Sequence, residues 1–175
     1  YYIMKEKRIL TFFDCDGTLI HTTLPEIGKP MWEKHHGKPY PHKGWWGREE
    51  SLDMDVFPNH VNPEVYSDYL WMKRHPMYLT FVLTSREPKL QSHLEKIFAK
   101  HDIAVERVMT KKGNYTKGQR MDHTIKEFSE HFEIVEVILY DDRNKEHATV
   151  EPYREEWKNK GIELTLIKIQ SDAQD

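Results

Sequence analysis

Cysteine is almost absent from the sequence, long apolar runs are missing, and neither sign of charge dominates. The single cysteine, Cys15, excludes an intrachain disulfide framework and suits a reducing cytoplasm. No apolar run approaches the roughly 18 residues of a membrane-spanning helix, and the first residues lack the apolar core of a signal peptide, so we expect a cytoplasmic protein without membrane contact. The formal net charge of −3 gives no general attraction to nucleic acid or anionic lipid. An anionic substrate must therefore be captured by local positive charge or by a metal ion.

Short apolar stretches alternate with amphipathic ones along most of the chain. A length of 175 residues suits one domain, residues 1–175. The alternation predicts an α/β fold with a mostly parallel, five-stranded sheet that is covered by helices on both faces, its last strand near an edge. The expected strands are 9–13, 77–85, 105–110, 133–142 and 162–169, and the expected helices are 62–75, 87–101, 121–132 and 146–161. Asn62 and Pro63 mark the start of the first helix, and Pro152 is expected to break or delay the last one.

Residues 20–61 do not follow this alternation. Structureless segments of that length are uncommon in compact domains and often serve as lids or binding loops. The segment is rich in tryptophan and contains five histidines. We therefore expect a small cap-like insert between the first strand and the first helix.

Two of the expected strands end in paired acids. Asp14 and Asp16 follow the first strand, and Asp141 and Asp142 end the fourth, while Thr84 ends the second. Ligands bind at the carboxyl ends of strands in an open parallel sheet, so these side chains are expected to meet. They are the components of a magnesium-dependent phosphoryl-transfer site, in which one carboxylate attacks phosphorus and another moves the proton of the leaving group. Alternatively, the acids are ordinary solvated loop residues. One acidic pair alone would favour that interpretation, but two pairs at the ends of two apolar strands favour a shared site.

The segment "DCDGTLI" after an apolar strand resembles the first motif of the haloacid dehalogenase superfamily, in the form typical of its phosphatases. "FVLTSRE" is similar to the second motif and "VILYDDR" to the fourth, so the resemblance extends from about residue 8 to residue 148. It implies a Rossmann-like three-layer sandwich with a capping insert. Shorter segments, among them "GWWGREESL" and the helix "RMDHTIKE", resemble the RNA-repair-like branch and the phosphatase domain of polynucleotide kinase-phosphatases.

The resemblance implies a role for each motif residue. Asp14 corresponds to the nucleophile, Asp16 to the general acid/base and Thr84 to the hydroxyl that binds the phosphoryl oxygens. Mg²⁺ would be bound by Asp14, the backbone carbonyl of Asp16 and Asp141, with Asp142 assisting through water or by orienting the site.

The lysine of the third motif has several candidates, because Lys111, Lys112, Lys117 and Lys126 all precede the fourth strand. Lys117 has a spacing familiar from many phosphatases of the superfamily but falls in a polar, glycine-containing segment. Lys126 lies in the helix that matches the repair-like branch. We predict Lys126 as the catalytic lysine.

Three further side chains are candidates for contacting the substrate. Ser85 and Arg86 follow the second motif directly, and the guanidinium of Arg86 suits a phosphate oxygen or else a surface salt bridge. Arg143 either contacts a polyanion or braces the acidic loop.

Trp45 and Trp46 either offer stacking faces for a base or form the core of the insert. The histidines at 35, 36 and 42 have no accompanying cysteine and no defined spacing, which favours solvated or phosphate-contacting roles over zinc.

The sequence thus predicts a Mg²⁺-dependent phosphatase that forms an aspartyl-phosphate, with a phosphomonoester substrate on a nucleic-acid end or a nucleotide. One alternative is a phosphatase of small metabolites such as sugar phosphates. The other is an inactive phosphate-binding or interaction module, against which Asp16 argues, because a module that only binds phosphate does not need a proton-transferring acid.

Overall fold

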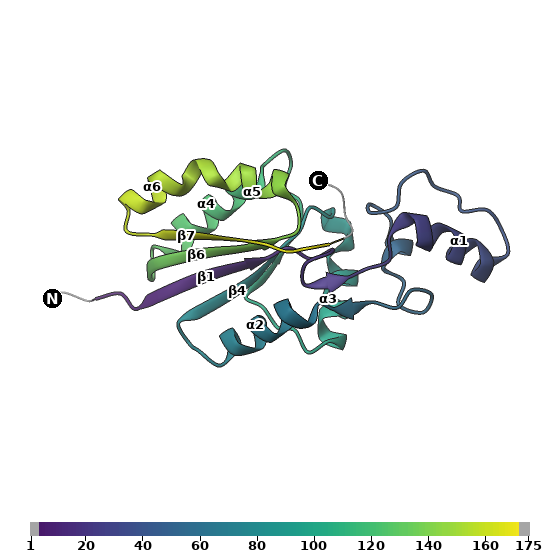
Figure 1. Cartoon of the computed structure of the whole chain (residues 1–175), viewed down its shortest axis with the longest axis horizontal. Helices are drawn as coiled ribbons and strands as arrows, with labels where there is room; N and C mark the ends of the chain where they lie inside the picture. The colour runs from purple at the N-terminus through teal and green to yellow at the C-terminus, as the bar shows by residue number, and fades with distance from the viewer. Residues whose placement is uncertain (1–3, 172–175) are drawn as a thin grey trace.

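Five parallel strands form the central sheet of the computed structural model, which describes residues 4–171 (Figure 1). Their order is β5-β4-β1-β6-β7, so that the first strand in sequence is the middle strand in space and β7 lies at an edge, as predicted. The strands are β1 Lys7–Phe13, β4 Tyr78–Leu83, β5 Arg107–Met109, β6 Glu133–Asp141 and β7 Glu163–Lys168. The predicted α/β class with a parallel five-stranded sheet is confirmed.

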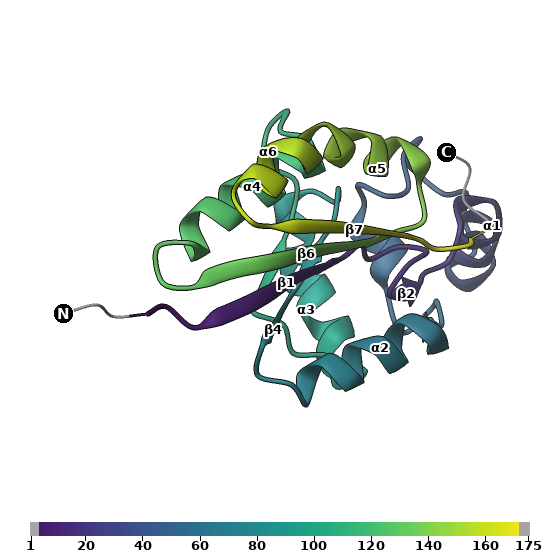
Figure 2. The ribbon, with the colours of Figure 1, turned by 60° about the vertical axis from the view of Figure 1, so that its left-hand side comes forward.

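Helices cover both faces of this sheet (Figure 2). Those on one face are α2 Pro63–Lys73 and α3 Gln91–Lys100; those on the other are α4 Lys117–Phe128, α5 Asn144–Val150 and α6 Arg154–Asn159. None of the helices in residues 4–171 is both long and apolar enough to cross a membrane.

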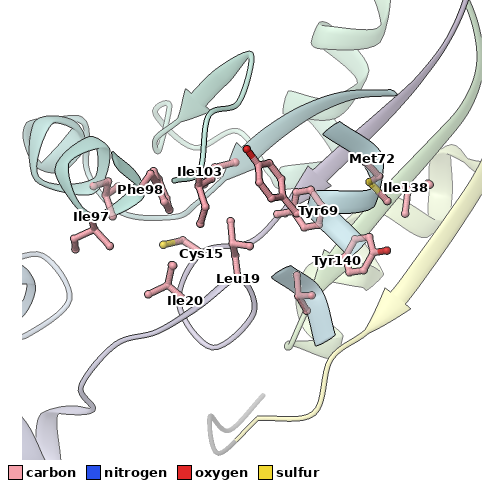
Figure 3. Close-up of a cluster of buried hydrophobic side chains, with 14 of the residues drawn as sticks. Cys15, Leu19, Ile20, Tyr69, Met72, Ile97, Phe98, Ile103, Ile138 and Tyr140 are labelled. Carbon is pink, nitrogen blue, oxygen red and sulfur yellow. The ribbon is translucent and has the colours of Figure 1, made fainter. Parts of the chain in front are cut away.

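The middle strand β1 is apolar on both sides because each side meets a layer of helices. Phe12 stacks on Phe81 of β4 with ring centroids 4.9 Å apart, and Phe13 stacks on Tyr140 of β6 at 4.8 Å. Cys15 lies in the same core as Phe13, beside Leu19 and Ile20 and toward α3 (Figure 3). The pairing register sets Phe13 level with Val82 and Tyr140, so the three central strands end side by side.

Local capping determines where α2 and α4 begin. Asn62 caps α2 by accepting a hydrogen bond from the Glu64 amide (3.2 Å), with Pro63 at the first helical position, as predicted. A capping box between Thr116 and Gln119 starts α4 four residues before the expected 121. The expected range 121–132 is therefore wrong by about one turn, and the error matters because it left Lys117 in a loop instead of at the start of a helix.

Residues 20–61 contain more regular structure than we expected. The short strands β2 Ile20–His21 and β3 His60–Val61 pair antiparallel and bring the two ends of the segment together. Between them lie α1 Pro25–His36 and the 3₁₀ helix η1 Glu49–Leu52. The sequence does not reveal α1 easily, since its first turns hold Pro25, Gly28 and Pro30 and its apolar residues Ile27 and Met31 are exposed.

The insert has a small core of its own, formed by Trp32, Trp45 and Phe57. The indole of Trp45 donates a hydrogen bond to the Thr23 carbonyl at 2.9 Å and packs so closely on Gly28 that a Cβ there would overlap the ring. Trp45 is therefore a structural residue of the insert, whereas Trp46 is half-buried.

Candidate active site

The carboxyl ends of β1, β4 and β6 meet in one cavity of about 250 Å³. Asp14 comes directly after β1, Thr84 after β4, and Asp141 is the last residue of β6. All three are buried, and Asp141 is fully so. The cavity is also lined by Asp16, Trp46, Ser85, Arg86, Lys117 and Arg143.

A single lysine joins the two acidic strand ends. Lys117 Nζ donates to Asp14 Oδ1 at 2.8 Å and to Asp141 Oδ2 at 2.7 Å, and its side chain is 3% exposed. Burial by itself would lower the pKa of Lys117, but the two carboxylates outweigh it and raise the pKa above its usual value. The lysine therefore stays charged between the two acids.

Asp14 is held in one orientation, since its other oxygen accepts a hydrogen bond from the Thr18 hydroxyl at 3.0 Å. Burial raises the pKa of Asp14 well above its usual value, and the nearby charges of Asp141 and Asp142 raise it further, while Lys117 lowers it. Lys117 alone therefore does not compensate for burying the negative charge of Asp14.

The donor set at this point fits a divalent cation. Asp14, Asp141 and Asp142 each offer a carboxylate oxygen, and these oxygens lie within 4.8 Å of one another. One lysine cannot neutralise three buried carboxylates, and hard cations such as Mg²⁺ prefer oxygen ligands. Among residues 4–171 no other group of histidine, cysteine and acidic side chains has such an arrangement, and the histidines at 35, 36 and 42 do not form one.

Gly17 allows Asp142 to approach the first loop. Its φ of +77° lies in the left-handed region, and a Cβ there would come within 2.5 Å of Asp142 Oδ2. That oxygen instead accepts a hydrogen bond from the Ser171 hydroxyl at 2.6 Å. The glycine of the DCDGT segment is therefore required by both backbone conformation and space.

Asp16 faces the same cavity but is paired differently. Arg86 donates from Nε to Asp16 Oδ2 at 2.8 Å and from Nη2 to Oδ1 at 2.7 Å, and the Thr22 hydroxyl adds a third bond at 2.5 Å. Burial would raise the pKa of Asp16, but Arg86 and Thr22 together hold it below its usual value. Arg86 itself is 4% exposed, so the surface salt bridge considered for it is excluded.

Lys126, the lysine predicted for the site, does not reach the cavity. Its side chain is 59% exposed and pairs with Asp122 one turn earlier at 2.9 Å. Lys117 occupies the expected place, two and a half turns away at the start of α4. The spacing considered for Lys117 was the better guide.

The helix segment "RMDHTIKE" does not line the cavity but holds neighbouring elements in place. The buried guanidinium of Arg120 donates to the carbonyls of Thr84 (3.0 Å), Met109 (2.6 Å) and Thr110 (2.6 Å). Asp122 accepts a hydrogen bond from the indole of the buried Trp157 at 2.9 Å. Arg120 thereby ties the helix that carries Lys117 to the ends of β4 and β5, a role that the sequence reasoning missed although the motif itself was noticed.

The remaining candidates line the cavity with different degrees of exposure. Ser85 is exposed, Arg143 is half-buried, and the Thr84 hydroxyl accepts a hydrogen bond from the Arg86 amide at 3.1 Å. Trp46 lies over the Arg86 guanidinium, with 5.2 Å between the guanidinium carbon and the ring centroid. His147 contacts the backbone of the site, since its Nε2 is 2.9 Å from the carbonyl oxygen of Asp141.

Comparison with family models and with curated proteins gives no match. Among solved structures, two chains of Pnkp1/Rnl/Hen1 complexes, one described as an RNA repair complex, superpose with TM-scores of 0.52 and 0.54 at 16% and 17% identity. These matches cover 99% of this chain but only 46% and 50% of the other chains, so this chain spans about half their length. A hydrolase of the haloacid dehalogenase-like family from Streptococcus pneumoniae matches with a TM-score of 0.51 at 12% identity, over 94% of both chains. The resemblance expected from the sequence is confirmed at the level of the fold, which is haloacid dehalogenase-like.

The acidic cluster predicts stabilisation by a divalent cation. Adding Mg²⁺ should raise the unfolding temperature, because a ligand that binds only the folded state stabilises it by about 2.7 kcal/mol at 100 times its Kd. Asp142→Asn should weaken this shift. The control is Asp122→Asn, which changes a buried acid outside the cluster and should keep the shift. Thermal unfolding with and without Mg²⁺ measures both, and an equal shift in the two variants would contradict the assignment of the site.

Proposed function

We propose that this chain is a Mg²⁺-dependent phosphatase that hydrolyses phosphomonoesters through an aspartyl-phosphate on Asp14. One observation carries the proposal: the ends of three neighbouring strands bring the Asp14 carboxylate, the Thr84 hydroxyl and the Lys117–Asp141 pair into one cavity. A nucleophile, phosphate-binding donors and a fixed positive charge are the parts that phosphoryl transfer requires.

The reaction has two steps. Arg86 and Thr22 lower the pKa of Asp16 in the free protein, whereas the negative charge of a bound phosphate favours its protonated form. An oxygen of Asp14 attacks phosphorus, the bond from phosphorus to the leaving oxygen breaks, and the protonated Asp16 donates its proton to that oxygen. A water molecule then attacks the phosphorus, Asp16 takes a proton from it, and the bond to Asp14 breaks to release inorganic phosphate. Thr84 and Ser85 donate hydrogen bonds to the phosphoryl oxygens, and Lys117 offsets the negative charge that develops on them.

Asp14, Asp141, Asp142 and the backbone carbonyl of Asp16 would hold the Mg²⁺. When bound, the ion supplies positive charge that lets an anionic carboxylate and an anionic phosphate approach each other. The excess of buried carboxylates over cations in the cluster supports this assignment.

Asp14→Asn tests the nucleophile. An amide cannot form the acyl-phosphate, so hydrolysis should fall to the background rate, while the variant keeps the wild-type melting temperature within a few degrees. Phosphate release from a phosphomonoester with Mg²⁺ measures the loss, and excess EDTA should abolish wild-type activity. Full activity of the variant, or of the wild type in EDTA, would disprove the mechanism.

Lys117→Ala tests the charge in the cavity against a matched lysine on the same helix. It should lower kcat/KM by about 10²-fold or more, as the loss of a positioned electrostatic donor does. Lys126→Ala removes an exposed lysine and should change kcat/KM less than about twofold, since surface pairs contribute little. The opposite order of the two variants would return the catalytic role to Lys126.

For the substrate we propose a nucleic-acid end or a nucleotide, handled in the cytoplasm. A second hollow of about 350 Å³ adjoins the first and shares Asp16, Trp46 and Arg143 with it. Ile27 and His21 complete an apolar and basic lining on the side of Asp16 where a leaving group would lie. Such a lining suits a base with an adjacent phosphate better than a polar sugar, and the likeness to chains of an RNA repair complex supports the same class.

Trp46→Ala tests this choice of substrate. A lost base stack costs about 1–3 kcal/mol, so KM for a phosphorylated oligonucleotide should rise roughly 5- to 150-fold. Hydrolysis of a small alkyl phosphate, which has no ring to stack on Trp46, should change less. Trp45→Phe is the control, because Trp45 belongs to the core of the insert and should affect stability more than KM.

A panel of 3′- and 5′-phosphorylated oligonucleotides, mononucleotides and sugar phosphates measures the preference directly. Higher activity on sugar phosphates would favour the metabolite phosphatase, and so would a Trp46→Ala variant that loses activity equally on the oligonucleotide and on the small phosphate ester. Phosphate binding without turnover of any compound would favour the inactive binding module.

A further inference from the structure

Arg86 connects the insert to the acid of the first loop. Its Nη1 donates to the Trp46 carbonyl at 3.0 Å and to the Ser51 hydroxyl at 2.7 Å, both in the insert, while Nε and Nη2 bind the two oxygens of Asp16. The side chain is buried, and so is Ser51. One guanidinium thus joins the end of β4, the insert and Asp16.

The hydrogen bonds of Arg86 leave little capacity for a phosphate. A guanidinium has five N–H donors, and the four bonds to Asp16, Trp46 and Ser51 engage most of them. Arg86 was expected to bind the substrate, but in this arrangement its planar fork is matched to a carboxylate.

Asp16 is left with one free direction. A carboxylate has about four acceptor sites, and Arg86 and Thr22 fill three of them. Asp16 nevertheless lines both the inner cavity and the outer hollow. The position of the remaining site is therefore set by groups that belong to the insert or are bound to it.

We propose that Arg86 is a positioning residue through which the insert fixes Asp16 opposite the leaving-group oxygen. The inference rests on the proposed phosphatase function and deepens it: seating of the insert, through Trp46 and Ser51, determines whether the proton-transferring acid is in place. Proton transfer requires a heavy-atom distance of about 2.6–3.2 Å, so a small displacement of Asp16 is sufficient to remove it.

The test compares esters that differ in their need for a proton. The leaving group of p-nitrophenyl phosphate departs without protonation, whereas that of an alkyl phosphate such as glycerol phosphate requires it. The measured quantity is kcat/KM, which reports the steps up to cleavage of the ester. Arg86→Gln should lower kcat/KM for the alkyl ester at least about tenfold more than for the aryl ester, a part of the 10²- to 10⁴-fold that general acid catalysis contributes. The Ki of inorganic phosphate should change less than about twofold.

Two further variants keep the test decisive if Arg86→Gln folds poorly. Ser51→Ala removes one insert bond to Arg86 without touching the cavity lining, and it should give the same selective loss, about 2- to 10-fold. Lys126→Ala removes an exposed positive charge that pairs with Asp122 outside the cavity and should leave the ratio of alkyl to aryl kcat/KM unchanged. Melting temperatures of all variants are measured alongside.

Equal losses on both esters with a raised phosphate Ki would show that Arg86 binds phosphate and would overturn the inference. So would an unchanged ester ratio in Ser51→Ala. If the wild-type protein hydrolyses neither ester nor any phosphorylated oligonucleotide, the proposed function itself fails, and that result is distinct from both.

Discussion

Buried negative charge at the carboxyl ends of β1 and β6 is the constraint on which the rest of the site depends. Three buried acids each place a carboxylate oxygen within 4.8 Å of the others, and Lys117 is the cation that contacts two of them. Replacing the lysine by an uncharged residue would leave carboxylates buried without compensation, which is costly in any fold. The position of α4, its capping box at Thr116 and the three carbonyl bonds of Arg120 all serve to keep Lys117 between Asp14 and Asp141.

A second ion pair performs a different task on the other side of the cavity. The Arg86–Asp16 pair joins the loops that follow the adjacent strands β4 and β1, and through Arg86 it extends into the insert. The two pairs divide the site into an inner half, which suits the phosphate and the metal ion, and an outer half, which suits the leaving group. In the proposed mechanism, chemistry at phosphorus and recognition of the leaving group would fall to separate parts of the chain that meet at Asp16.

The insert is small, yet it is built as a unit. Antiparallel pairing of β2 with β3 joins its ends, Trp45 fills its core, and Trp46 turns toward the cavity and the guanidinium of Arg86. The two neighbouring tryptophans thus differ in their surroundings, and they lie at a turn in which the Arg48 amide donates to the Trp45 carbonyl at 3.0 Å. Figure 1 shows α1 lying beyond the carboxyl ends of the strands.

The sequence by itself determined the sheet and the acids. Apolar runs that end in DCDG and DD are local patterns, and strand length, burial on both faces and the chemistry of the strand ends all follow from residues close together in the chain. What only the tertiary structure decided are the partners of those acids, because Lys117 lies 103 positions from Asp14 and Arg86 lies 70 positions from Asp16. Four lysines lie between β5 and β6, and Lys117 is the one that enters the cavity because its helix starts a turn earlier than expected. The same holds for Trp45 and Trp46, whose burial depends on how the insert closes on itself rather than on their own sequence.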